Sequence, residues 1–149
     1  MTQPISHASR TVRYDLPLLF AGQAQKEFTV NDALTRVSTL LHPAVEGESA
    51  APPDDPVDGE CWQVASPASD AWAGQEGAIA CRTDAAWVFI QPSIGLRCYD
   101  KAAGTTLLFD GTWQRPEALA PASGGTTQDT EARAAIASLI ASLEQSGLI

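Results

Sequence analysis

The stretch RTDAAWVFI, residues 82–90, decides the fold because it contains a complete β-hairpin signal. Two strand-like runs flank a short turn that begins at Asp84 and ends before Trp87. An aspartate starts turns well because its side chain accepts hydrogen bonds from main-chain amides two residues on. The indole that follows can cover the mouth of the hairpin. The stretch therefore predicts two antiparallel strands joined by a tight turn.

The stretch LFDGTWQRP, residues 108–116, repeats this arrangement nearer the C-terminus. Asp110 again precedes a tryptophan, Trp113, by three positions, and Gly111 between them tolerates a positive φ. A looser third copy, SDAWAG, lies at residues 69–74. We therefore predict a set of hairpins with indole lids.

Short strand-like runs also recur on both sides of these hairpins, which is typical of an antiparallel sheet. The runs are ECWQVAS, GAIACRT, AWVFIQP, GLRCYD, TTLLFD and TWQRP. They predict an antiparallel β domain over residues 61–116, folded as a sandwich or a barrel-like body. Residues 44–60 before it concentrate Pro, Asp, Gly and Ala, so a surface loop is expected there.

The N-terminal part predicts a helix. Residues 16–43 open with the hydrophobic run LPLLF and continue into a helical pattern over residues 22–41, which His42-Pro43 ends. The apolar positions of this pattern are Phe28, Val30, Leu34, Val37 and Leu41. The more polar side carries Gln23, Gln25, Lys26, Asn31, Asp32 and Arg36. Residues 1–15 are polar and show no period, so a flexible arm is expected there.

A second helix is predicted at the C-terminus, over residues 127–149, after a linker at residues 117–126. Thr127 or Asp129 can cap its start, and Gly147 can cap its end. Its apolar positions repeat at helical spacing and are Ile136, Leu139, Ile140 and Leu143. A helix this short is marginal alone in water, so it either folds back on the sheet or bundles with copies of itself. The expected class is thus α+β, with a separate C-terminal oligomerisation or docking helix.

Composition limits the function classes. The chain has 149 residues, 44% of them hydrophobic, which suits one folded unit with tails. Its formal net charge of −9 opposes binding to a phosphate backbone, so nucleic acid is not expected as a partner. Neither a signal peptide nor an apolar run of about 20 residues is visible, so we expect no membrane span and folding in the cytoplasm. The three cysteines are expected to be buried, reduced thiols.

Signatures of catalysis and metal binding are missing from the sequence. Lys26 and Glu27 are neighbours on a helix, where successive side chains point about 100° apart, so they are not expected to act as an acid–base pair. The two histidines, His7 and His42, lie apart from any ligand cluster. We therefore predict no catalytic residue, no metal site and no cofactor. An enzyme that degrades polysaccharide, which needs two carboxylates across the scissile bond, stays as an alternative.

The tryptophans allow a binding function. Trp72, Trp87 and Trp113 fall on the predicted hairpin loops, where aromatic faces suit the C–H surfaces of sugars. A carbohydrate-binding module that contacts a capsule glycan through these three indoles is therefore one hypothesis. The alternative is that most of them pack in the core or against hairpins.

Several segments of the sequence resemble a known protein family. They are LPLLFAGQAQKEFTVNDAL at residues 16–34, the stretch from DGECW to RCYD at residues 58–100, LLFDGTWQ at residues 107–114 and the closing EARAAIASLIASLEQSGLI. Together they resemble an alphaproteobacterial phage and gene-transfer-agent family of virion proteins, catalogued as a domain of unknown function. The closest likeness is to a component at the base of a head spike.

The resemblance implies a structural role in a particle. It implies a virion location after assembly in the bacterial cytoplasm, and no catalytic residues to carry over. The implied partners are a capsid or tail protein, a spike fibre protein, further copies of the chain in a pentamer or trimer, and capsular polysaccharide of the recipient cell. Anchoring is expected through Leu18, Phe20, Gln23, Gln25, Lys26 and Glu27. A tail-fibre-associated protein is the alternative within this setting.

Overall fold

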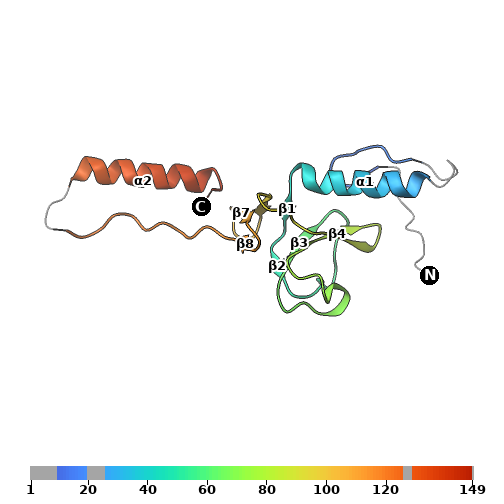
Figure 1. Cartoon of the computed structure of the whole chain (residues 1–149). Helices are drawn as coiled ribbons and strands as arrows, with labels where there is room; N and C mark the ends of the chain where they lie inside the picture. Colours follow the sequence, from blue (N-terminus) through green and yellow to red (C-terminus); the bar gives the residue numbers. More distant parts are fainter. Residues whose placement is uncertain (1–9, 20–25, 126–128, 149) are drawn as a thin grey trace.

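The computed structural model describes residues 10–19, 26–125 and 129–148. The N-terminal helix α1 (Lys26–Leu41) lies over a body of two small sheets, and the C-terminal helix α2 (Thr130–Gln145) lies apart from that body (Figure 1). Most strand pairs are antiparallel, and the two sheets form a sandwich-like core. The predicted α+β class, with its N-terminal helix, hairpin body and separate C-terminal helix, is confirmed.

The first sheet contains β2 (Glu48–Ser49), β3 (Cys61–Val64), β4 (Ile79–Thr83) and β5 (Ala86–Ile90), in that order. Thr83 pairs with Ala86, so Asp84 and Ala85 alone form the turn between β4 and β5. Both turn residues have positive φ values, 47° and 60°, as the two-residue turns that match the strand twist require. The hairpin predicted from residues 82–90 is confirmed.

The second sheet contains β1 (Ala44–Val45), β6 (Arg97–Asp100), β7 (Thr105–Phe109) and β8 (Trp113–Gln114), in that order. Asp110 begins the β7–β8 turn and its Oδ1 accepts a hydrogen bond from the Thr112 N–H at 3.3 Å. Gly111 in this turn has a φ of 120°. The second predicted hairpin is therefore also confirmed, with the aspartate in the expected role.

Two expectations within the body are corrected. Residues 44–60, expected as a loop, contain β1 and β2, which pair in parallel with β6 and β3. Each strand has two residues, and its partners lie far along the chain, so no local periodicity marks it. The SDAWAG copy at residues 69–74 forms a short 3₁₀ helix, η1 (Asp70–Trp72), instead of a hairpin.

The core consists of two clusters on opposite faces of the first sheet. Between the two sheets lie Val45, Cys61, Ile79, Cys81, Ile90 and Cys98. On the other face, Val64, Ala78 and Ala80 pack with Trp72, which η1 supplies. The three cysteines are free and buried, as predicted.

The N-terminal segment folds against α1. Within residues 10–19 the Thr11 N–H donates to the Leu16 carbonyl at 2.9 Å, and Arg10 and Pro17 form a β-bridge. Arg13 then donates to the Thr39 and His42 carbonyls at 3.1 and 2.8 Å, and so caps the C-terminal end of the helix. The expected flexible arm is corrected for residues 10–15, which are held in place, whereas residues 1–9 lie outside the described residues.

The helix α2 has the predicted caps. The Asp129 carboxylate accepts from the Ala132 N–H at 2.9 Å, and Gly147 has a φ of 67°. The Gly147 carbonyl accepts from the Thr106 N–H at 2.7 Å, so the end of α2 contacts the start of β7. The preceding residues 115–125 are exposed apart from a half-buried Pro116 and carry no regular structure, as expected for a linker.

We expect Gly59→Ala to destabilise the fold more than Gly74→Ala. Both glycines have positive φ values, 94° and 79°, which cost an L-residue about 1–2 kcal/mol. A Cβ at Gly59 meets Val12 Cγ1 at 2.8 Å, whereas one at Gly74 meets nothing within 4 Å. Urea unfolding should show an additional loss of about 1 kcal/mol for Gly59→Ala, because the Val12 side chain must shift. Equal losses would contradict this packing.

Candidate functional site

The helix α1 turns its polar face inward. Its buried side chains are Asn31, Thr35, Ser38 and Thr39, none of them apolar. The Asn31 Oδ1 accepts from the Leu19 N–H at 2.8 Å, while its Nδ2 donates to the Leu19 carbonyl at 3.0 Å. Ser38 Oγ donates to Thr11 Oγ1 at 3.2 Å. We call this contact between residues 10–19, α1 and β4 the polar seam. Only about 20 Å³ of space remains within it, beside Cys81.

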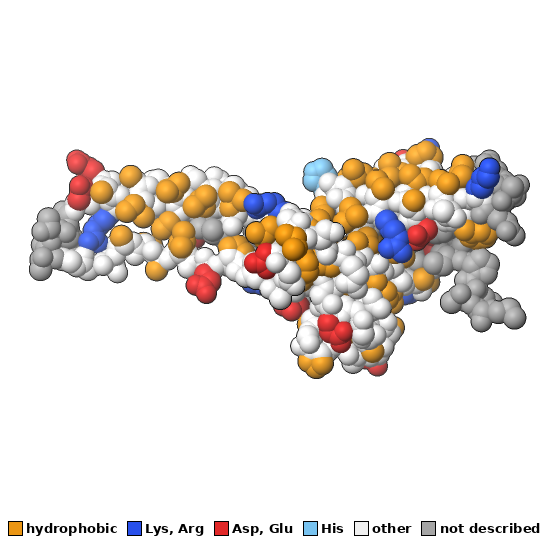
Figure 2. Space-filling view, viewed as in Figure 1, with side chains coloured by type: hydrophobic (Ala, Val, Ile, Leu, Met, Phe, Trp, Pro, Cys, Tyr) orange, Lys and Arg blue, Asp and Glu red, His pale blue; other side chains and the backbone are white. Residues whose placement is uncertain are grey.

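The opposite side of α1 is apolar and exposed. The side chains Val30, Val37, Leu40 and Leu41 follow one another along it, and we call them the α1 stripe. Val37 is 48% exposed and Leu41 is 52% exposed. Figure 2 shows hydrophobic side chains along the outward side of α1. Because apolar area is normally removed from water, a helix with its apolar side outward is a feature that the packing of the body does not explain.

This orientation corrects part of the sequence prediction. Asn31, placed by the sequence on the more polar side together with Asp32 and Arg36, is buried, while those two residues stay exposed and form an ion pair at 2.9 Å. Leu18, expected to contact an anchoring partner, is buried and lines the polar seam. Lys26 is exposed at the first residue of α1. Of the other expected anchoring residues, Phe20, Gln23, Gln25 and the side chain of Glu27 lie outside the described residues.

The helix α2 is exposed along its length. None of its described residues is buried. Leu139 is 60% exposed and Ile136 is 45% exposed, while Ile140 and Leu143 are half-buried. In Figure 1 the helix runs alongside the linker that leads to it, away from α1 and the first sheet. Its four predicted oligomerisation residues thus occupy a helix that the body does not cover.

The three indoles do not share one surface. Trp72 is fully buried in the cluster against η1, so the glycan contact expected for it is corrected. Trp87 packs edge-on against Trp72, with ring centroids 5.0 Å apart. The Arg82 guanidinium lies 5.3 Å from the centre of the Trp87 ring. Trp113 belongs to the other sheet, where its Nε1 donates to the Gly77 carbonyl at 2.8 Å.

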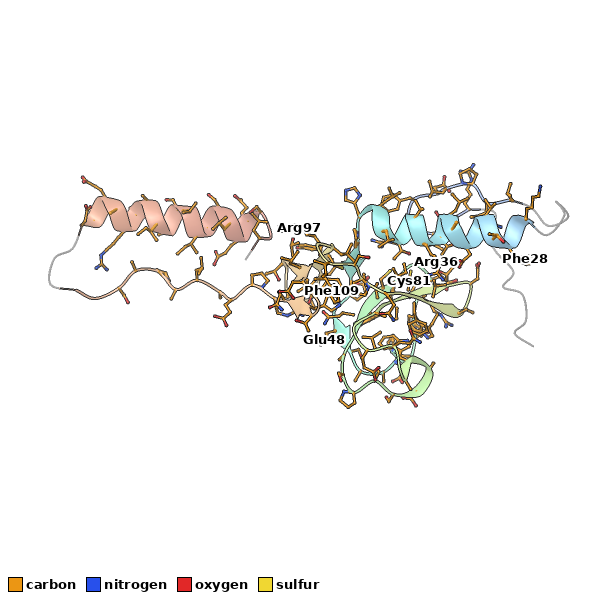
Figure 3. All side chains as sticks on the ribbon, in the orientation of Figure 1. Phe28, Arg36, Glu48, Cys81, Arg97 and Phe109 are labelled. Atoms are coloured by element: carbon orange, nitrogen blue, oxygen red, sulfur yellow. The ribbon has the colours of Figure 1, made fainter. Side chains whose placement is uncertain are left out.

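A groove of about 410 Å³ opens beside Trp113, between β2, β3 and the β7–β8 hairpin. We call it the intersheet groove. Phe109 and Trp113 form one wall, with ring centroids 5.2 Å apart. Figure 3 shows Phe109 and Glu48 close together on the two sheets that meet here. Its polar lining consists of Glu48, Gln63, Ser66, Glu76, Gln91 and Thr112.

Gln63 lies at the base of this groove with an unsatisfied acceptor. Its side chain is only 7% exposed, and its buried Oε1 has no hydrogen-bond partner. Near it, the main-chain N–H of Glu76 and then that of Ala68 donate to the Glu76 carboxylate and lower its pKa, so this group is charged at neutral pH. None of the described lining residues is basic. The groove therefore offers mainly acceptors.

The sequence patterns did not single out Gln63, Glu48 or Glu76. Gln63 occupies an inward position of β3, in the run CWQV, where a polar residue breaks the apolar pattern of a buried strand. That break is the one local signal of the groove. The two glutamates are distant from Gln63 in sequence, and the pairing of β2 with β3 brings Glu48 beside Gln63.

The thiols between the sheets differ in their pKa values. Cys61 and Cys81 face each other across β3 and β4. A hydrogen bond between them lowers the pKa of Cys81 to about 6, with help from the Thr39 and Thr83 hydroxyls, and raises the pKa of Cys61. Burial raises the pKa of Cys98 to about 12. The lower pKa follows the hydrogen bonds, because Thr39 donates to Cys81 Sγ at 3.5 Å.

Within residues 10–19, 26–125 and 129–148, no three His, Cys, Asp or Glu side chains are arranged to hold a metal ion. No helix in the described part of the chain has the length and apolar character needed to cross a membrane.

Comparison with known families identifies the body. Residues 30–114 match the family described as a protein of unknown function (DUF2793), and the match covers more than half of the chain, so the chain belongs to this family. The matched region runs from within α1 to the end of β8, and leaves out residues 10–19 and α2. No curated protein and no solved structure matches the chain.

We expect Asn31→Ala to weaken the fold by roughly 2–4 kcal/mol, because it leaves the Leu19 N–H and carbonyl without partners beneath α1. Asp32→Ala is the matched control, since it removes an exposed ion pair worth about 0.5 kcal/mol or less on the same helix. Urea unfolding of the two variants measures the difference. Similar losses would show that the polar seam does not hold α1.

Proposed function

We propose that this chain is a non-enzymatic structural protein of a phage-like particle, the base of a head spike or fibre of a gene transfer agent. It anchors a fibre to a capsid or tail protein and assists attachment to the recipient cell. The setting comes from the sequence resemblance. The roles of the parts are inferred from the two exposed apolar helix faces.

The α1 stripe is the observation that carries the proposal. Its exposed valines and leucines lie on a helix whose polar face already fills the contact with the body. A stripe of this kind has the form of a helix that lays its apolar side into a groove of a partner. Residues 10–19 hydrogen-bond to the buried polar face of α1 and hold the helix in place, so the stripe lies on a fixed element. We assign anchoring to the particle to this stripe, in place of the buried Leu18.

The helix α2 supports the second half of the proposal, self-assembly. An isolated helix of its length is marginal in water, and α2 receives little cover from its own body. Its apolar side, with Ile136 and Leu139 exposed, suits association with the α2 helices of other copies. A pentamer or trimer multiplies a weak anchoring contact, because copies joined in one assembly bind with avidity.

The carbohydrate-binding alternative needs one surface on which the three indoles contact a glycan together, and they do not form one. Trp72 is buried and Trp87 is covered on one side, while Trp113 borders the intersheet groove. We therefore do not base the proposal on glycan binding. The contact with the recipient's capsular polysaccharide is assigned to the fibre that this protein holds.

We expect Val37→Lys together with Leu41→Lys to remove the protein from particles while leaving its fold intact. Both side chains are about half exposed, so charge costs the isolated protein little but disrupts an apolar contact. Particles purified from the producing bacterium, probed by immunoblot, should contain about tenfold less of this variant or lower.

The matched control for the α1 stripe is Thr29→Lys, which adds a charge to an exposed position of the same helix outside the stripe. It should enter particles as the wild type does. Normal incorporation of the Val37 and Leu41 double variant would contradict anchoring through α1, and absence of the wild-type protein from purified particles would contradict the proposed function itself.

We expect Leu139→Lys to lower the mass of the assembly in solution and to leave the β circular dichroism unchanged, because α2 lies apart from the two sheets (Figure 1). Ala134→Lys, on the opposite side of α2, is the control. Light scattering over a concentration series measures both variants. An unchanged mass for Leu139→Lys would show that α2 does not join the copies.

A further inference from the structure

We propose that the intersheet groove binds the Arg97 side chain of a second copy of this chain, and that this contact joins the copies head to tail. The inference rests on the proposed self-assembly and names the partner residues of one interface. It uses a surface separate from the α1 stripe and from the apolar side of α2.

The chemistry of the groove favours a cation with several N–H donors. Gln63 Oε1 is buried at its base without a partner, and an unpaired buried acceptor is unfavourable. Glu76 adds a charged carboxylate, and Glu48 adds another that Arg115 approaches only at 3.9 Å. The Trp113 N–H is already used by the Gly77 carbonyl. A ligand that brings donors and positive charge therefore fits better than one that brings acceptors.

The aromatic wall narrows the choice to a guanidinium. Phe109 and Trp113 stand edge to face beside the carboxylates. An arginine side chain stacks on aromatic rings through its flat face and donates through five N–H groups at its edge. It can thus satisfy Gln63 and Glu76 while it lies against the rings. An ammonium group, strongly hydrated and compact, uses such a wall less well.

Arg97 is the arginine that this chain has available. It is exposed at the start of β6 and forms no hydrogen bond or ion pair with the described residues. The other described arginines each have a hydrogen-bond or ion-pair partner within the chain. Figure 3 places Arg97 on the side of the second sheet nearer to α2, away from Glu48.

The register places the two parts of this contact on opposite faces of one sheet. Cys98 pairs with Leu107, and both are buried between the sheets. Phe109 shares the face of Leu107, because side chains alternate along a strand, and so faces the groove. Arg97 pairs with Leu108 and faces the other way. Arg97 therefore does not enter the groove of its own chain, and it is free to enter that of the next.

A contact between opposite faces of one protein is heterologous, and such contacts close into rings when the rotation between copies allows it. The scarcity of positive charge makes the pairing specific, since the chain has nine Lys and Arg against eighteen Asp and Glu. A single arginine presented to an acceptor-rich groove thus fixes the order of the copies. Copies that are also joined through α2 make both kinds of contact at once, which strengthens the whole assembly.

The test is a double-substitution cycle on the full chain. Arg97→Ala removes the donor, and Gln63→Leu removes the acceptor at the base of the groove while keeping its bulk. Sedimentation over a concentration series gives the dissociation constant of the assembly. Each variant should raise the dissociation constant at least about tenfold. The chain with both substitutions should have the same dissociation constant as the single variants, because all three lose the same contact between Arg97 and the groove. Arg36→Ala, which removes an arginine with partners of its own, should leave the constant unchanged.

The outcomes separate the two proposals. If Arg97→Ala assembles with the wild-type dissociation constant, the Arg97 contact is overturned and self-assembly stands. The same conclusion follows if Arg97→Ala and Gln63→Leu each raise the dissociation constant and their increases multiply in the chain that carries both. A wild-type chain that stays monomeric at every concentration overturns self-assembly and this contact together. A third outcome assigns the groove to a glycan. In that case capsular polysaccharide quenches the tryptophan fluorescence of the wild type but not that of Trp113→Phe, and Arg97→Ala assembles normally. Gln63→Leu should unfold at the wild-type urea concentration or above, so a loss of assembly cannot be ascribed to misfolding.

Discussion

The paired hydrogen bonds between Asn31 and the main chain of Leu19 are the constraint on which the surfaces of this protein depend. A helix packed by apolar contacts alone would turn its valines and leucines toward the body. Here the buried amide of Asn31 and the hydroxyl of Ser38 need polar partners, and residues 10–19 supply them, while Thr39 donates to Cys81 Sγ of β4. Because polar groups buried without partners are costly, this seam fixes the rotation of α1 about its axis. The apolar stripe consequently faces outward.

The two sheets are joined by a few polar contacts between distant segments. Arg115, just after β8, reaches the buried Asp100 of β6 at 2.5 Å and Glu48 of β2 at 3.9 Å. Trp113 donates across to the Gly77 carbonyl ahead of β4. These contacts tie the edges of the sheets together and leave a groove between them. The body thus holds its own core and still presents an acceptor-rich opening, while α1 and α2 present apolar faces elsewhere.

The sequence predicted those features whose signals are local. The Asp-to-Trp spacing located both hairpins, since turn chemistry acts over a few residues, and Asp129 and Gly147 marked the caps of α2 for the same reason. Periodicity detected α1 but could not decide which side faces the body, because that choice depends on Leu19 and on β4. The strands β1 and β2 and the groove around Gln63 depend on pairings distant in sequence, which no window along the chain reveals. Trp72 fits the same pattern, since its burial depends on η1 and on the far face of the first sheet.

The polar face of α1 holds the helix with its apolar stripe outward, and the side-chain amide of Asn31 reports on this orientation most directly. Heteronuclear NMR of the full chain measures the exchange of that amide with water and its contact with Leu19. If α1 is held in this orientation, the Asn31 amide exchanges slowly and contacts the Leu19 main chain, and a soluble paramagnetic agent broadens the methyl signals of Val37 and Leu41. An Asn31 amide that exchanges as fast as the exposed Gln145 amide, with stripe methyls shielded from the agent in the monomer, would contradict it.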